Sequence, residues 1–263
     1  MTAALRKHWP EYLMEAAGLG AFMISACTFA VLLEHPASPL RAALPNATAR
    51  RGCMGLAMGL TAAAIVYSPW GRQSGAHLNP SVTLAFLTLR RIPRVDAAFY
   101  AGAQVVGGAL GVLAAWALLG ARLSHPAAHF ALTAPGPGGA LLAFGAEAAI
   151  SFVLMTVVLH VSGSRHARLT GICAAALVAV YILVEAPISG MSMNPARSLA
   201  SALAARRFGS LWIYFTAPPL GMLLAAILYA RRGQQGCAKL VHASDSRCIF
   251  CEERAARPAG GRA

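Results

Sequence analysis

Charged residues are scarce in this 263-residue chain. Only 12% of its positions are Asp, Glu, Lys or Arg, and only nine residues are acidic. Soluble domains carry about a quarter charged residues, so the composition argues against an ordinary soluble domain. The apolar segments also lack a phosphate-binding loop, a nucleophile with a neighbouring base and a catalytic metal motif. We therefore expect a protein that is not an enzyme.

Apolar residues make up 57% of the chain and gather in long segments. Each segment has roughly 20 residues, which is enough to cross a hydrocarbon core of about 30 Å. The first one follows Arg6 and Lys7, as a signal peptide would, but it is too long and contains Glu15, so we interpret it as a retained helix. The predicted spans are Glu11–Leu33, Cys53–Tyr67, Ala97–Leu119, Leu141–Val161, Leu169–Pro187 and Leu211–Ala230.

The net charge of +13 is distributed unevenly between the two ends of these spans. If both termini lie on one side, that side holds ten Lys and Arg residues before the tail is counted, and the opposite side holds six. The positive-inside rule then predicts cytoplasmic termini. A lipid bilayer accounts for the basic residues, and we expect no nucleic-acid partner.

One motif occurs twice in the chain. Ser74–Thr83 and Ser189–Ser198 both contain Ser-Gly-x-x-x-Asn-Pro, 115 residues apart. Asn at an N-cap and Pro at the first helical position are typical of helix starts. A short apolar segment follows each Asn-Pro, and we expect two half-helices that enter the membrane without crossing it.

The two halves of the chain repeat one plan. Glu15 and Tyr100 in the first half correspond to Glu147 and Tyr214 in the second. Three spans per half place the second copy upside down in the membrane, and the interrupted segments of such repeats meet near the midplane. The predicted membrane domain covers residues 1–232, with repeats at about 10–119 and 141–230, and a cytoplasmic tail covers 233–263.

The paired motif, with Arg197 behind its second copy, resembles the aquaporin or major intrinsic protein family of membrane channels. The stretch Pro187-Ile188-Ser189-Gly190 is similar to nodulin-26-like members. The resemblance implies an all-α, right-handed bundle of six transmembrane helices and two re-entrant half-helices. It also implies a homotetramer of bacterial type in an inner membrane. The implied function is passive passage of water or small uncharged solutes such as glycerol, urea and neutral metalloid acids.

The Asn-Pro motifs are the expected centre of the pore. Each half-helix start carries about half a positive charge, and the two Asn amides donate to a passing oxygen there. Positive dipole ends with midplane donors exclude cations and interrupt a proton wire. The motif residues are Asn79, Pro80, Ser81, Asn194, Pro195 and Ala196, and the loop carbonyls before them belong to His77, Leu78, Ser192 and Met193.

The selectivity filter is carried over by position in the family. Arg197 matches the family's arginine directly, and a charge at membrane depth is usually functional. Met191, Ile182 and Met58 complete the set, with Gly59 as the alternative to Met58. Strict water channels resemble one another in having His at the position of Ile182, so an apolar filter favours neutral solutes larger than water.

Glu15 and Glu147 lie inside predicted spans, where an isolated carboxylate is costly. We expect each to accept hydrogen bonds from the backbone of a re-entrant loop, which is a structural role. Proton coupling through these carboxylates is the alternative and would make the protein a transporter.

The tail carries a separate cluster of residues that can bind metal. Its spacing, C-x4-H-x5-C-x2-C, supplies three thiolates and one imidazole, a set that suits tetrahedral zinc. Redox-sensitive thiols are the alternative. If the tail were the active part, the protein would be a membrane-anchored metal or redox sensor. The residues are Cys237, His242, Cys248 and Cys251.

Overall fold

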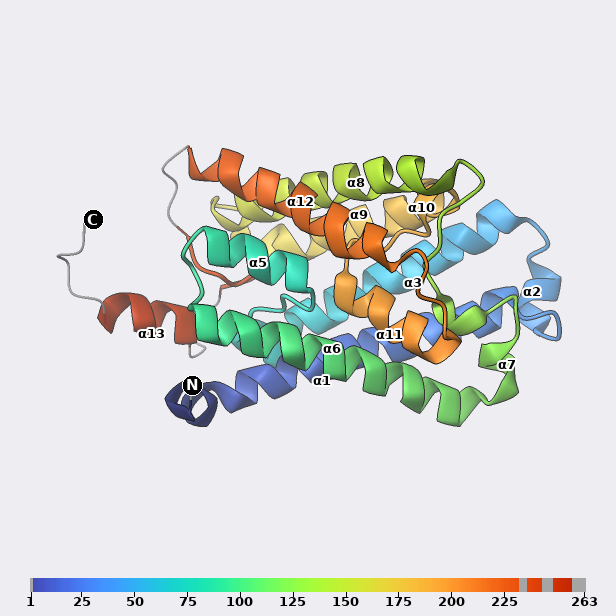
Figure 1. Cartoon of the computed structure of the whole chain (residues 1–263), viewed down its shortest axis with the longest axis horizontal. Coiled ribbons are helices and arrows are strands. Elements are labelled where there is room, and N and C mark those ends of the chain that lie inside the picture. Colours follow the sequence, from blue (N-terminus) through green and yellow to red (C-terminus); the bar gives the residue numbers. More distant parts are fainter. Residues whose placement is uncertain (1, 232–235, 243–247, 257–263) are drawn as a thin grey trace.

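The computed structural model describes residues 2–231, 236–242 and 248–256, and these residues form helices and loops without a strand. Six long helices run alongside one another (Figure 1). They are α1 (Thr2–Glu34), α3 (Ala47–Tyr67), α6 (Arg94–Leu119), α8 (Gly139–Ser162), α9 (Thr170–Val184) and α12 (Leu211–Ala230).

Two short helices lie among the long ones and begin where the sequence predicts. Helix α5 (Pro80–Thr88) and helix α11 (Pro195–Ala205) both start at the proline of an Asn-Pro pair. Asn79 caps α5 by accepting from the Ser81 N–H, and Asn194 caps α11 in the same way. Figure 1 shows α5 toward one end of the molecule and α11 toward the other.

The remaining elements are short and connect the long helices. Helices α4 and α10 are equivalent, because each precedes an Asn-Pro loop and ends at a glycine with positive φ, Gly75 (99°) or Gly190 (83°). The short elements are α2 (Pro39–Ala43), α4 (Pro69–Ser74), α7 (Ala121–Ser124), η1 (His129–Ala131), η2 (Ala167–Leu169), α10 (Ala186–Ser189) and α13 (Ile249–Ala256).

Helix packing follows the repeat. Helix α1 packs along α6 in the first half, and α8 packs along α12 in the second. A Cβ built on Gly107 would lie 2.1 Å from the Ala16 carbonyl oxygen, and one on Gly221 would lie 2.2 Å from that of Ala148. Only glycine permits this approach of two backbones. Each half-helix packs on the other half, α11 against α6 and α5 against α12.

The long helices differ from the predicted spans at several ends. Five of those described are long and apolar enough to cross a membrane, and α3 falls short on hydropathy. Helix α3 begins at Ala47 rather than Cys53, because the Asn46 cap starts it six residues earlier, ahead of Arg50 and Arg51. Helix α1 begins at Thr2 rather than Glu11, and α9 ends at Val184 rather than Pro187.

The C-terminal segment returns to the bundle. Helix α13 lies at the end of the molecule where α1 begins (Figure 1), and Lys7 Nζ is 3.7 Å from Glu252 Oε2. Residues 236–242 precede it without regular structure, and Ala238, Leu240 and Val241 belong to the main hydrophobic core. Of the predicted tail, residues 233–235, 243–247 and 257–263 lie outside the described residues.

Candidate functional site

The two Asn-Pro loops meet at the centre of the bundle and hold each other. Asn79 Nδ2 donates to the Met193 carbonyl at 2.7 Å, and Asn194 Nδ2 donates to the Leu78 carbonyl at 2.7 Å. An amide carries two N–H donors and a carbonyl has two lone pairs. Each Asn therefore keeps one donor, and each carbonyl keeps one acceptor site, beyond this reciprocal pair of bonds.

The loops have the same unusual backbone. Ala76 and Leu78 have φ of 52° and 51°, and their counterparts Met191 and Met193 have 48° and 54°. Left-handed conformations at residues other than glycine carry strain and persist where the surroundings impose them. Here the alternation turns successive peptide groups, so the two loops present N–H groups to one side and carbonyls to the other.

Glu15 holds the first Asn-Pro loop in place through hydrogen bonds. Its carboxylate accepts from the N–H groups of His77 (3.0 Å) and Leu78 (2.6 Å), and from the side chains of Ser74 (2.8 Å) and Gln104 (2.8 Å). The glutamate is fully buried. Four donors occupy both oxygens, which is the arrangement that offsets burying a carboxylate.

Glu147 does the same for the second loop. It accepts from the N–H groups of Ser192 (2.6 Å) and Met193 (2.7 Å) and from the Ser189 hydroxyl (2.7 Å). This glutamate is also fully buried. Both halves therefore hold their loops through a buried glutamate that accepts hydrogen bonds from the loop.

A cavity of about 350 Å³ passes the two Asn side chains. At one end it is lined by Glu34, Arg51 and Met54, and at the other by Val66, Gly171 and Leu240. The topology places these ends at opposite ends of α3. We call the end with Val66, Gly171 and Leu240 the tail-side mouth. The cavity is therefore elongated along the bundle, with the Asn pair between its ends.

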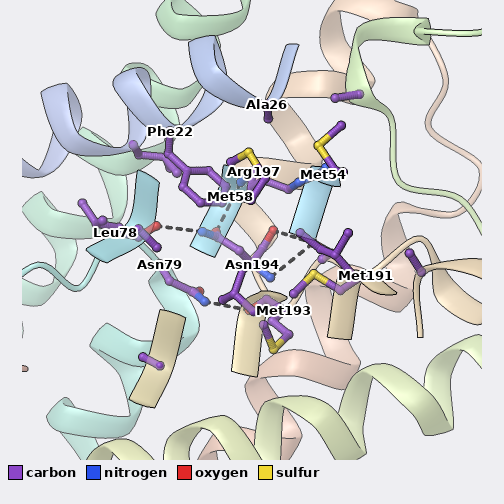
Figure 2. A pocket seen from close by; sticks show the side chains of 18 of the residues that line it. Phe22, Ala26, Met54, Met58, Leu78, Asn79, Met191, Met193, Asn194 and Arg197 are labelled. Atoms are coloured by element: carbon purple, nitrogen blue, oxygen red, sulfur yellow. Dashed lines mark hydrogen bonds between the residues drawn. The ribbon is translucent and has the colours of Figure 1, made fainter. Parts of the chain in front are cut away.

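The four predicted filter residues line this cavity together. Figure 2 shows Arg197 and Met58 close to each other, beside Asn194, and Met191 and Ile182 also line the wall. The Ser25 hydroxyl contacts Met58 Sδ at 3.8 Å. Gly59, the alternative to Met58, does not line the cavity and packs against Ala175 instead.

Arg197 brings a cation to the cavity wall. Its backbone N–H belongs to the Asn194 cap at 3.2 Å, which fixes where the side chain starts. Within the described part of the chain, Nη1 of the guanidinium makes no hydrogen bond. Arg197 as a whole is partly exposed and lines the cavity, so its guanidinium can donate to a hydroxyl or carbonyl oxygen of a solute.

Sequence reasoning missed the contribution of α1. Phe22 and Ala26 line the cavity close to Arg197 (Figure 2). The repeat could have found them, because Phe22 stands seven residues after Glu15 on one helical face. Leu154 stands seven residues after Glu147 and lines the cavity too.

The four tail residues with metal-binding side chains come together. Their ligand atoms all lie within 4.8 Å of one another. The Sγ atoms of Cys237 and Cys248 are 3.3 Å apart, and Cys251 Sγ is 3.4 Å from His242 Nε2. The hydrogen bond between the two thiols lowers the pKa of Cys248 well below its ordinary value and raises that of Cys237. Metals bind the thiolate form that a lowered pKa favours.

The fold defines an α-helical membrane protein in which two half-helices meet at the centre, beside an elongated cavity. A family model described as "Major intrinsic protein" matches residues 5–229. The chain belongs to the major intrinsic protein family.

Curated relatives agree with the family. "Aquaporin NIP1-3" of Oryza sativa subsp. japonica is 42% identical over 173 residues, which are 65% of this chain and 58% of the relative. "Aquaporin NIP6-1" of Arabidopsis thaliana is 41% identical over 180 residues, 68% of this chain and 56% of the relative. The match thus spans less than two thirds of these plant proteins.

A solved structure supports the fold. The aquaglyceroporin from Plasmodium falciparum superposes with a TM-score of 0.68 at 20% sequence identity, covering 84% of this chain and 95% of that chain. At this identity the likeness concerns the arrangement of helices.

Proposed function

We propose that this protein is a passive channel for water and small uncharged solutes, and that it catalyses no reaction. The observation that carries the proposal is the elongated cavity that passes Arg197 and the two Asn side chains that cap the half-helices. Both half-helix starts point their positive ends at the centre, where a cation would be repelled.

The wall favours solutes that carry both carbon and hydroxyl or amide groups. Phe22, Met58, Met191 and Ile182 offer apolar contact, and Arg197 offers donors. Such a wall costs little for the carbon face of glycerol or urea while one polar group is bound. We propose that these solutes, and neutral metalloid acids of similar size, pass beside water.

The test is stopped-flow light scattering on proteoliposomes, with water, glycerol and urea as permeants. We expect the wild type to pass glycerol and urea. Ile182→His should lower solute passage about tenfold, a barrier change of about 1.4 kcal/mol, while water passage is kept. Imidazole is larger in width and polar, so it narrows the cavity beside Arg197.

Ile182→Val is the matched control, because it keeps an apolar side chain and should leave solute passage unchanged. Wild-type protein that passes water alone would contradict the proposed solute range. Passage of neither water nor solute would contradict the channel itself.

We propose further that the protein is a homotetramer in an inner, plasma-type membrane with both termini in the cytoplasm. The family resemblance supports the tetramer, and the distribution of Lys and Arg supports the orientation. A bacterial membrane stays a prediction from sequence, since the relatives above are plant proteins.

Proton-coupled transport is the second candidate and is disfavoured by the bonding of Glu15 and Glu147. Donors engage both oxygens of each carboxylate, so neither is placed to exchange a proton with the cavity. A transporter would respond to a pH gradient, and we expect no such response.

For the tail we propose a zinc site, while the channel itself needs no cofactor. A tetrahedron with metal–sulfur bonds of about 2.3 Å has sulfur–sulfur edges of about 3.8 Å. The separations of 3.3 Å and 3.7 Å from Cys237 to the other two sulfurs are close to this value. A metal-sensing role for the tail is therefore compatible with a channel.

A further inference from the structure

We propose that the tail is a metal-operated gate. A bound zinc ion fixes residues 237–242 across the tail-side mouth, and loss of the ion releases them and opens the pore. The inference rests on the proposed channel function and the proposed zinc site, and adds the coupling between them.

The tail is seated on the pore loop itself. Leu240 N–H donates to the Gly75 carbonyl at 3.1 Å, and His77 Nε2 forms a hydrogen bond with the Ala238 carbonyl. Gly75 and His77 belong to the loop that leads to Asn79. A Cβ on Gly75 would lie 3.1 Å from Lys239 Cγ, so the two segments are in close contact.

The tail segment 237–242 also reaches the cavity. Leu240 lines the tail-side mouth together with Val66 and Gly171. Ala238, Lys239, Leu240 and Val241 are all buried, and none is more than 7% exposed. A solute leaving the cavity at this end therefore passes Leu240, which the tail supplies.

The helix after the cluster adds a second contact. The Phe250 ring lies parallel to the imidazole of His77, with centroids 5.9 Å apart, and meets the Tyr100 ring edge-on at 6.0 Å. Phe250 is between the metal-binding residues Cys248 and Cys251. A metal ion that fixes these two cysteines thus also fixes the ring that packs on the pore loop.

The four metal-binding residues connect the two tail segments that contact the pore loop. Cys237 and His242 flank the residues at the mouth, while Cys248 and Cys251 flank Phe250. Segment 236–242 has no regular structure and α13 has eight residues, so neither is rigid by its own hydrogen bonds. A metal ion that ligates both segments links them to each other and so keeps both in contact with the pore loop.

The experiment combines metal content with permeability. Purified full-length protein is loaded with one equivalent of Zn²⁺ or stripped with a chelator, then reconstituted for stopped-flow measurement with water and glycerol. We expect one zinc per chain after loading, and permeability severalfold lower for loaded than for stripped protein.

Three variants make the result specific. The double variant Cys248→Ser/Cys251→Ser should lose zinc and show the high permeability of stripped protein under both conditions. Phe250→Ala keeps all four ligands, so it should bind zinc but respond to it less than wild type does. Cys53→Ser is the matched control, since it removes a cysteine of α3 outside the cluster and should behave as wild type.

Several results would overturn the gate. Zinc bound at one per chain with equal permeability in loaded and stripped protein would leave a metal site that does not act on the pore. If an oxidant lowered the permeability of protein without bound metal, the gate would depend on a disulfide rather than on a metal ion. No zinc uptake overturns the site. If neither water nor glycerol crosses in any variant, the channel function fails, and zinc stoichiometry still tests the site separately.

Discussion

At the scale of single residues, Glu15 and Glu147 explain how polar loops are kept inside an apolar bundle. A carboxylate offers about four acceptor positions, and the loops present N–H groups that no helix satisfies. A carboxyl group that meets donors on both oxygens is better suited here than an amide, which would bring donors of its own to the same place. The same bonds keep Leu78 and Met193 in position to accept from the opposite Asn.

The residue-scale prediction concerns Glu15→Gln. Glutamine replaces one acceptor oxygen by an NH₂ donor, which would face the donors of Leu78 and Gln104. Each donor left unsatisfied costs about 1–3 kcal/mol. We expect a clear drop in the temperature at which the detergent-solubilised protein loses its monodisperse elution peak.

Glu34→Gln serves as the control for this change. Glu34 is partly exposed and pairs with Arg50 at 3.1 Å. The Arg50 guanidinium also donates to the carbonyls of Leu44 and Pro45, so it keeps acceptors after this change. If Glu15→Gln were as stable as Glu34→Gln, the structural role of Glu15 would be wrong, and the proton-coupled alternative would regain support.

At the scale of helices, glycine contacts set the packing within each half. The backbone of α6 touches α1 at Gly107, and that of α12 touches α8 at Gly221. Lipid gives helices no hydrophobic reason to associate, so close van der Waals packing has to do so. The equivalence of these two contacts is why both halves leave the same space for a half-helix.

The element-scale prediction compares two glycines of the α8–α12 pair. In Gly221→Ala the added Cβ would meet the Ala148 carbonyl at 2.2 Å, and overpacking of this kind costs about 1–3 kcal/mol. We expect lower thermal stability in detergent and less folded protein in the membrane fraction.

Gly145→Ala, on α8, is the matched change. No heavy atom lies within 4 Å of a Cβ built there, and alanine is better than glycine in a helix by about 1 kcal/mol. It should be neutral or stabilising. Equal loss of stability in both variants would show that space at Gly221 is not what limits packing.

The starts of both half-helices could be predicted because Asn-Pro carries its own local chemistry, an N-cap followed by a residue that fits the first turn. Phe22 was missed because its role depends on which face of α1 turns inward. The start of α3 was missed because its first turn is polar and depends on the Asn46 cap. The docking of Ala238–Val241 has no periodic signal, since four residues cannot show an amphipathic pattern.

At the scale of the whole molecule, the even number of long helices places the start of the first and the end of the last at the same end of the bundle. Chemical labelling can test this arrangement. Helix α13 and the start of α1 lie at one end, whereas α2 and α7 lie at the other (Figure 1). We therefore expect the membrane to separate Cys251 from Ser124, which are both exposed at their own ends.

We expect a membrane-impermeant maleimide to label Ser124→Cys from outside intact cells, in a background without the native cysteines. In a second variant, which keeps Cys251 as its only cysteine, the maleimide should react only after the membrane is opened. Labelling of both from outside would contradict cytoplasmic termini. Labelling of neither after opening would show that these ends are covered in the membrane.

The two copies of the motif differ at several positions, and at one of them an apolar residue in the first half corresponds to an arginine in the second. The residue three places after Asn79 is Val82, and the residue three places after Asn194 is Arg197, and both line the cavity. A pore without an energy source must satisfy microscopic reversibility, so this difference cannot make transport faster in one direction at equal concentrations. The difference places the highest free-energy barrier to permeation away from the centre of the pore. A solute that enters from one side therefore meets this barrier early in its passage, and a solute that enters from the other side meets it late.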